Sequence, residues 1–296
     1  MTPREIELVL PNLTIAGRAW GDPALPPLLA LHGWLDNAAS FDRLAPLLCA
    51  HFHIVAIDLP GHGRSGWRPA GTWYHYVDYL GDALAAADAL GWAKFGLLGH
   101  SLGGAVASAL AAACPERVER LLLIEALGPI TSLPERALPL LTQALHERAG
   151  VAEKSLRVFP DAQIAVAARR QANGLSDVAA QTLVSRALKA VSGGFSWSSD
   201  PRLTLTSPQR YMEEQILGIL AGIQAPTFVL LAEPEPPFLP RAMIDKRIAQ
   251  VRDIVVRRLP GTHHLHLEDP QAVAACILDY VAKPDSITRS NATTPL

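Results

Sequence analysis

The segment around Ser101 constrains the fold of this 296-residue chain more than any other. The apolar run Phe95–Leu98 predicts a buried strand, and the alanine-rich run Leu102–Ala113 predicts a helix. Between them, Gly99 and Gly103 stand two positions either side of the serine, where a Cβ would collide with the crossing strand or helix. This G-x-S-x-G pattern is typical of a strained strand-to-helix turn that exposes a nucleophilic serine. The alternative, a connection whose glycines serve packing alone, explains the pattern less well.

Short apolar segments alternate with helical patterns along most of the chain. The expected strands are Ile6–Leu10, Leu13–Ala19, Pro27–Leu31, His53–Ile57, Phe95–Leu98, Val118–Ile124, Pro226–Leu231 and Ile254–Leu259. The expected helices between them are Ser40–Cys49, Trp73–Leu90, Leu102–Ala113 and Pro270–Val281. Such alternation predicts an α/β fold with a mostly parallel sheet flanked by helices on both faces, preceded by an antiparallel pair of strands.

One long interval, between Leu127 and about Gln224, breaks this alternation. It carries helical patterns at Pro134–Ala149, Ala162–Ala172, Asp177–Val191 and Pro208–Leu220 but no strand of the sheet. An insertion that follows a strand end is typical of a lid. We therefore predict a core of residues 1–127 and 224–282, an all-helical cap over 128–223 inserted after the strand ending near Ile124, and a flexible tail at 283–296.

Composition narrows the classes of partner. Hydrophobic residues make up 49% and charged residues 18%, which predicts a globular protein with a sizeable core. A formal net charge of −2 with scattered basic residues favours a small neutral substrate and argues against nucleic acid or a membrane surface. The three cysteines form no C-x-x-C pair, and no secretory or membrane-spanning run is present, so we expect a cytoplasmic protein. Oligomeric state leaves no signal in the sequence.

A serine nucleophile needs a base, and the segment 261–270 offers three histidines. His263 lies nearest the expected strand exit at Gly261, whereas His264 and His266 lie nearer the next helix, so His263 is the predicted base. Three close histidines could instead ligate a metal ion. No further Cys or His pair completes a zinc site, so neither metal nor cofactor is predicted.

An oxyanion formed at Ser101 needs hydrogen-bond donors. The predicted donors are the backbone N–H of Leu102 and that of Trp34, which Gly33 allows to come close. We expect His32 to support this loop rather than to react. The residues expected to line the substrate pocket are His32, Gly33, Trp34, His100, Leu127, Phe195, Trp197 and Phe238, of which the apolar ones could equally belong to the core.

Taken together, four segments resemble the α/β-hydrolase superfamily. They are His32–Asn37, Asp58–Ser65, Gly99–Gly104 and Gly261–Pro270. Residues 31–42 and 260–270 are similar in particular to the serine hydrolase-like proteins, a branch related to esterases, epoxide hydrolases and haloalkane dehalogenases. The spacing of histidine, acid and proline in the superfamily matches His263, Glu268 and Pro270. The resemblance implies a serine nucleophile and argues against epoxide hydrolase and dehalogenase chemistry, because those relatives carry an aspartate at this position.

The acid that would orient His263 has two candidates. Most relatives place it after the strand matched by Pro226–Leu231, where Glu235 falls at the usual position but Ala232 replaces a glycine and prolines restrict the loop. Some dehalogenase relatives use the position of Glu125, at a rigid strand end. We favour Glu125 and keep Glu235 as the alternative. Either carboxylate could also be structural, with Glu125 capping the start of the cap and Glu235 solvated.

These residues together predict a cofactor-free serine hydrolase. It would cleave a small, largely apolar ester or related acyl compound through a Ser-His-acid triad and an acyl-enzyme. Carbon–carbon bond hydrolysis, or another cofactor-free reaction on the same fold, is the alternative among enzymes. A non-catalytic protein that binds a small molecule stays open because of the irregular acid loop.

Overall fold

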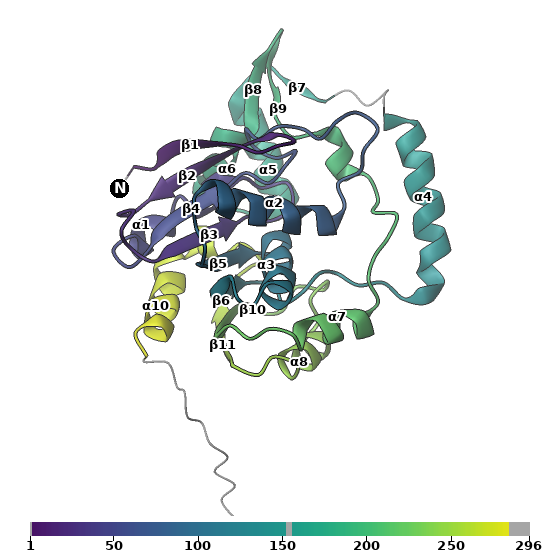
Figure 1. Cartoon of the computed structure of the whole chain (residues 1–296). Helices are drawn as coiled ribbons and strands as arrows, with labels where there is room; N and C mark the ends of the chain where they lie inside the picture. Colours follow the sequence, from purple (N-terminus) through teal and green to yellow (C-terminus); the bar gives the residue numbers. More distant parts are fainter. Residues whose placement is uncertain (1, 152–155, 284–296) are drawn as a thin grey trace, which may run out of the picture.

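An eight-stranded sheet runs through the centre of the molecule (Figure 1). The structure, a computed structural model, describes residues 2–151 and 156–283. In spatial order the strands are β1 (Arg4–Val9), β2 (Thr14–Trp20), β4 (His53–Ile57), β3 (Pro27–Leu31), β5 (Phe95–His100), β6 (Val118–Ile124), β10 (Thr227–Glu233) and β11 (Ile254–Pro260). The pairs from β4 to β11 are parallel, and β1–β2 and β2–β4 are antiparallel.

Alternate strand residues face two apolar layers. Leu29 and Leu97 pack in one layer, whereas their neighbours Leu28 and Leu98 pack in the other. The first layer is covered by α2 (Tyr76–Ala89), α3 (Leu102–Ala113), α7 (Glu213–Leu220) and α8 (Arg241–Ile248). The second is covered by η1 (Ala38–Phe41), α1 (Ala45–Leu48), α9 (Leu265–Glu268) and α10 (Pro270–Val281). The predicted α/β fold with helices on both faces is thereby confirmed.

Several elements have the bounds predicted for them. Strands β3, β4 and β6 and helices α3 and α10 begin and end at the expected residues. The single helix expected over Ser40–Cys49 is instead divided into η1 and α1. Pro46 lies in the first turn of α1, where its missing N–H costs no hydrogen bond, so the chain starts a new helix there.

The cap was expected to be all-helical, and this prediction is wrong. It contains η2 (Pro134–Arg136), α4 (Ala137–Ala149), α5 (Ala162–Asn173), α6 (Asp177–Ala187) and η4 (Pro201–Thr204), together with a three-stranded antiparallel sheet of β7 (Val158–Phe159), β9 (Gly194–Trp197) and β8 (Leu188–Val191). The helix expected to reach Val191 ends at Ala187. Gly193 and Gly194 have φ of 86° and 136°, a backbone that favours glycine and turns the chain into a hairpin.

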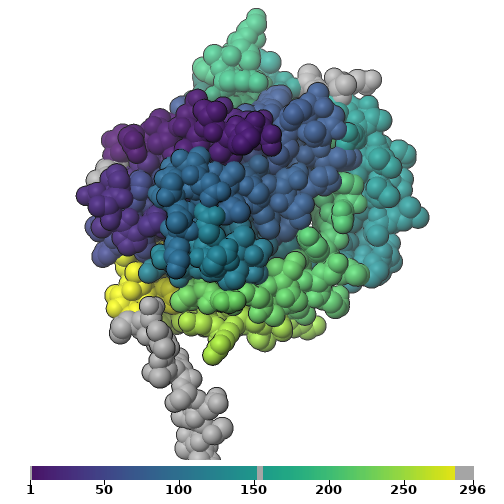
Figure 2. Space-filling view, in the orientation of Figure 1, coloured from purple at the N-terminus to yellow at the C-terminus, as the bar shows by residue number. Residues whose placement is uncertain are grey.

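The parts of the cap lie differently against the core. The hairpin projects beyond the N-terminal strands, and α4 stands at the edge of the molecule (Figures 1 and 2). Helix α7 packs through Ile216 and Leu220 into the core layer that contains α3. The predicted flexible tail, apart from Lys283, lies outside the described residues. Among the helices in the described ranges, none combines the length and apolarity needed to cross a bilayer.

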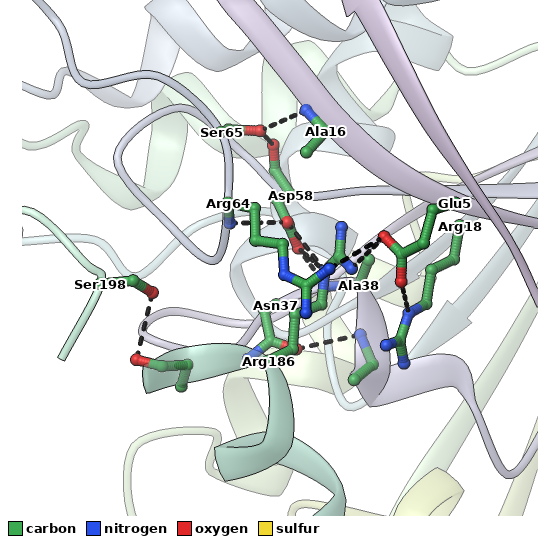
Figure 3. A network of polar contacts seen from close by, with 12 residues as sticks. Glu5, Ala16, Arg18, Asn37, Ala38, Asp58, Arg64, Ser65, Arg186 and Ser198 are labelled. Atoms are coloured by element: carbon green, nitrogen blue, oxygen red, sulfur yellow. Dashed lines mark hydrogen bonds and ion pairs between the residues drawn. The ribbon is translucent and has the colours of Figure 1, made fainter. Parts of the chain in front are cut away.

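Helix α6 of the cap is joined to the core by a buried ion pair (Figure 3). Arg186 Nε lies 2.9 Å from Asp58 Oδ2, and neither side chain has any exposed surface. The same carboxylate accepts hydrogen bonds from the N–H groups of Ala38 at 2.7 Å and Arg64 at 2.8 Å. Asp58 therefore links the cap to the two loops that follow β3 and β4.

Candidate active site

Ser101 lies at the turn between β5 and α3 in a strained backbone conformation. Its φ of 51° and ψ of −115° fall in a region that residues with a side chain rarely adopt. The turn is held by the Ser101 N–H, which donates to the Ile124 carbonyl at 3.1 Å. A Cβ at Gly99 would lie 2.5 Å from the Gly104 Cα, and one at Gly103 would lie 2.0 Å from the Leu31 carbonyl oxygen. Both glycines are therefore required by close backbone contacts.

The loop after β11 brings His263 to the serine. Its Nε2 lies 2.9 Å from Ser101 Oγ, and its Nδ1 lies 3.1 Å from Glu125 Oε2. Burial lowers the pKa of His263, while the hydrogen bond to Glu125 raises it by a smaller amount. The imidazole is therefore neutral near pH 7, as a general base must be.

Glu125 lies at the end of β6, also with a positive φ, of 56°. Its side chain is fully buried, and both carboxylate oxygens are engaged. Oε1 accepts a hydrogen bond from the Ala232 N–H, and Oε2 faces His263. Glu235, the other candidate, is partly exposed at the surface and pairs with Arg241. The structure thus brings Glu125, and not Glu235, to the histidine.

The loop that carries Trp34 contacts the helix that follows Ser101. The Gly103 N–H donates to the His32 carbonyl at 3.0 Å, which places the loop after β3 against the first turn of α3. Leu102, in that turn, has no intrahelical acceptor for its N–H. Among residues 2–151 and 156–283, neither the Leu102 nor the Trp34 N–H has a protein partner.

The residues expected to line a pocket divide into two groups. Phe238 lies edge-on to His263 with ring centroids 4.9 Å apart and is 45% exposed, so it lies at the opening of the site. Trp34 is 54% exposed, and its indole N–H donates to the Leu203 carbonyl of η4 at 3.0 Å. Gly33 borders His100, whose Nδ1 would lie 2.9 Å from an added Cβ.

Other residues of that expected set do not face the serine. His32 is buried, accepts from the Leu59 N–H at 2.9 Å and has its pKa lowered to about 4 by burial, so it supports the loop as a neutral ring. Leu127 is fully buried in the core layer beside α3. Phe195 and Trp197 belong to the cap sheet, where Trp197 packs against Phe159 with ring centroids 5.2 Å apart. The structure therefore places His32 in a loop interior, Leu127 and Trp197 in apolar layers, and Phe195 opposite Phe159 in the cap sheet, instead of around Ser101.

A buried polar cluster beside His263 was missed by the sequence reasoning. Asp36 Oδ2 lies 3.6 Å from His100 Nδ1 and 3.4 Å from His264 Nε2, and Asp36 Oδ1 accepts from Arg169. The carboxylate and the two imidazoles could each offer one atom to a metal ion, because these atoms lie within 4.8 Å of one another. Arg169 already balances the charge of Asp36, however, so a divalent ion would bring uncompensated positive charge into a buried place.

The remaining histidine of the segment serves packing. His266 Nε2 lies 2.7 Å from Ser40 Oγ, and burial lowers its pKa well below the ordinary value. Its ring packs on His100 with centroids 4.2 Å apart. His264 and His266 therefore connect loops to one another, and of the three histidines only His263 reaches Ser101.

The fold agrees with the comparisons to known proteins. A model of the alpha/beta hydrolase family matches residues 28–276, and the chain belongs to that family.

Among its relatives are serine hydrolase-like proteins. One from Danio rerio is 32% identical over 94% of this chain and 88% of its own length. Serine hydrolase-like protein 2 from Homo sapiens is 29% identical over 94% of this chain and 93% of its own. These relatives support a hydrolase role.

Solved structures are also similar. A hypothetical protein from Pseudomonas aeruginosa PAO1 is 40% identical, with a TM-score of 0.89 and coverage of 94% of this chain and 99% of that one. A thioesterase domain from the curacin biosynthetic pathway is 27% identical, with a TM-score of 0.81 and coverage of 94% and 100%.

Proposed function

We propose that this protein is a serine hydrolase that cleaves a small, largely apolar ester or related acyl compound through an acyl-enzyme on Ser101. The observation that carries the proposal is the continuous chain of contacts from Ser101 Oγ through His263 to Glu125, at 2.9 and 3.1 Å. An isolated serine hydroxyl is a weak nucleophile, and this arrangement supplies the base and the group that orients it.

The reaction proceeds in two halves. His263 Nε2 accepts the Ser101 proton as Oγ attacks the acyl carbon, and the developing oxyanion binds the Leu102 and Trp34 N–H groups. The imidazolium then protonates the leaving group, and the acyl-enzyme remains. In the second half His263 takes a proton from water, the hydroxide attacks the ester carbon, and the proton returns to Ser101. These groups complete acyl transfer without a cofactor.

The acid of the proposed triad is Glu125. Its buried carboxylate accepts the Nδ1–H of His263, which fixes the tautomer that leaves Nε2 free to act as a base. The Ala232 N–H holds the second oxygen, so the carboxylate cannot rotate away.

Aromatic rings at the opening support an apolar acyl substrate. Phe238 packs against His263, and the half-exposed Trp34 indole is held by η4 of the cap. The likeness to a thioesterase domain supports a thioester as one form of the acyl compound.

A fluorophosphonate probe tests the proposal, because it reacts with an activated serine. We expect intact-mass analysis to show one adduct on the wild-type protein and none on Ser101→Ala. Absence of labelling, or equal labelling of both proteins, would overturn the proposal. A panel of p-nitrophenyl esters of increasing chain length and vinylogous diketones, tested in parallel, separates ester cleavage from carbon–carbon bond hydrolysis.

A further inference from the structure

One buried carboxylate, that of Asp36, lies beside the sequence neighbours of both Ser101 and His263. Asp36 stands two residues after Trp34, and its Oδ2 faces His100, which precedes Ser101, and His264, which follows His263. The distances from Oδ2 to the two ring nitrogens are 3.6 and 3.4 Å. Asp36 thus lies where three segments meet: the loop after β3, which carries Trp34, the end of β5, which precedes Ser101, and the loop after β11, which carries His263.

His100 connects two of these segments through its ring. Its Nε2 lies 2.8 Å from the carbonyl oxygen of His263. A carbonyl only accepts, so Nε2 carries a hydrogen and donates it. The ring therefore ties the residue before Ser101 to the main chain of His263, and its orientation sets where the imidazole of His263 lies.

The other ring nitrogen of His100, Nδ1, faces Asp36. Nδ1 is fully buried and, like Asp36 Oδ2, makes no hydrogen bond within the described ranges. The Asp36 carboxylate lies against the Nδ1 side of the ring, 3.6 Å away, while Nε2 is held by the His263 carbonyl on the other side. These two contacts hold the ring in this orientation.

The cap holds this carboxylate from the other side. Arg169 of α5 donates to Asp36 Oδ1. Asn37, the residue after Asp36, donates through Nδ2 to the Leu183 carbonyl of α6 at 2.9 Å. These contacts join two cap helices to the loop that carries Trp34.

We propose that Asp36 is a positioning residue for the reaction described above, an inference that rests on the proposed function. Arg169 of the cap holds Asp36, and Asp36 fixes His100. His100 in turn holds His263 against Ser101. Asp36 is 3% exposed and contacts no atom of the Ser101–His263–Glu125 chain at hydrogen-bond distance, so its contribution is indirect. We expect Asp36→Asn to lower kcat by about 10- to 100-fold with little change in KM, because geometry rather than substrate binding is lost.

Substitutions of Asp36 and of Arg169 should shift the pH profile of the reaction in opposite directions. The groups that face His263 are Glu125 directly after β6, His100 of β5, Asp36 of the loop after β3, the neighbouring His264, and His266 of α9. The charge of Asp36 raises the pKa of His263, and Arg169 offsets that charge. Asp36→Asn should therefore move the acid limb of kcat/KM to lower pH, and Arg169→Met should move it to higher pH.

The experiment measures kcat, KM and the acid limb of ester hydrolysis for the wild type, Asp36→Asn, Arg169→Met, Arg169→Lys and Arg170→Met. Arg170 is the matched control, because it lies on the same helix but pairs with exposed Asp177. We expect Arg170→Met to retain the wild-type profile and Arg169→Lys to restore it at least in part. A merely structural role would change amplitudes without opposite displacements.

The outcomes are separable. Acid limbs displaced in opposite directions by Asp36→Asn and Arg169→Met support the inference, and displacements that are absent or in one direction overturn it. If Asp36→Asn does not fold by circular dichroism, the displacement in Arg169→Met and its reversal in Arg169→Lys decide alone. A wild type that neither hydrolyses esters nor reacts with the fluorophosphonate contradicts the proposed function instead.

Discussion

Glu125 Oε2 lies 3.1 Å from His263 Nδ1 although the two residues are 138 positions apart in the chain. The parallel strands bring them together. β10 lies between β6 and β11, and the residues that follow the carboxyl ends of these strands lie at the same end of the sheet. Glu235 follows β10, nearer in sequence to His263, yet its side chain turns to Arg241.

The first prediction concerns this acid. Glu125→Gln should lower kcat for ester hydrolysis by about 10³- to 10⁴-fold, because the amide no longer favours the Nδ1–H tautomer of His263. Steady-state kinetics measures the loss. Glu235→Gln is the matched control and should retain wild-type kcat, since that side chain pairs with Arg241 outside the triad. A large loss in Glu235→Gln with none in Glu125→Gln would reverse the assignment.

The second prediction concerns pH and stability. Burial lowers the pKa of His32 to about 4 and that of His62 to about 3. Both rings are neutral when folded but bind protons when unfolded below about pH 6.5, so the unfolded state gains protons as the pH falls. The free energy of unfolding should therefore decrease from pH 6.5 to 4, measured by urea denaturation.

His62→Phe should reduce this dependence, and the exposed control His146→Gln should leave it unchanged. An equal pH dependence in His62→Phe and wild type would contradict the argument.

Sequence reasoning reached those features that neighbouring residues determine. The G-x-S-x-G turn, the bounds of β3, β4 and β6, and the lack of room for a Cβ at Gly99 and Gly103 follow from short patterns in which each residue has one compatible environment. The placement of His263 relied on its position just after a strand.

Features that depend on distant contacts were not readable in this way. Arg169 reaches Asp36 across 133 positions, and an arginine on a helix face looks the same in the sequence whether it is solvated or buried. Strand β8 was predicted as the end of a helix because Leu188–Val191 continues a helical pattern, and only its pairing with β9 identifies a strand. Leu127 and Trp197 were placed in a pocket because aromatic and aliphatic residues fit a core and a binding site equally well.

The third prediction concerns the ion pair that joins the cap to the core (Figure 3). Burial raises the pKa of the Asp58 carboxyl, and Arg186 opposes this effect. Arg186→Met would leave that carboxylate buried without its partner, so we expect a loss of about 3–5 kcal/mol in the free energy of unfolding. Chemical denaturation measures the loss. Arg170→Met, which breaks an exposed pair, should cost no more than about 1 kcal/mol. Similar losses in the two variants would show that the buried pair contributes no more than a surface one.

The fourth prediction compares two glycines that lie in helices. A Cβ at Gly103 would lie 2.0 Å from the Leu31 carbonyl oxygen and 2.7 Å from that of His32, and both are main-chain atoms that cannot rotate aside. Gly103→Ala should therefore lower the free energy of unfolding by about 1–3 kcal/mol and separate α3 from the loop that carries Trp34, which also lowers kcat. Gly81 lies in α2, where an added Cβ would have no atom of the described residues within 4 Å apart from its chain neighbours and the adjacent backbone of the helix. Gly81→Ala should raise stability by about 0.4–1 kcal/mol and leave kcat unchanged, because alanine reduces the conformational freedom of the unfolded chain.

Thermal and urea denaturation, together with steady-state kinetics, measures stability and kcat for both variants. A Gly103→Ala protein as stable and active as Gly81→Ala would show that the serine turn tolerates a side chain where β3 meets α3.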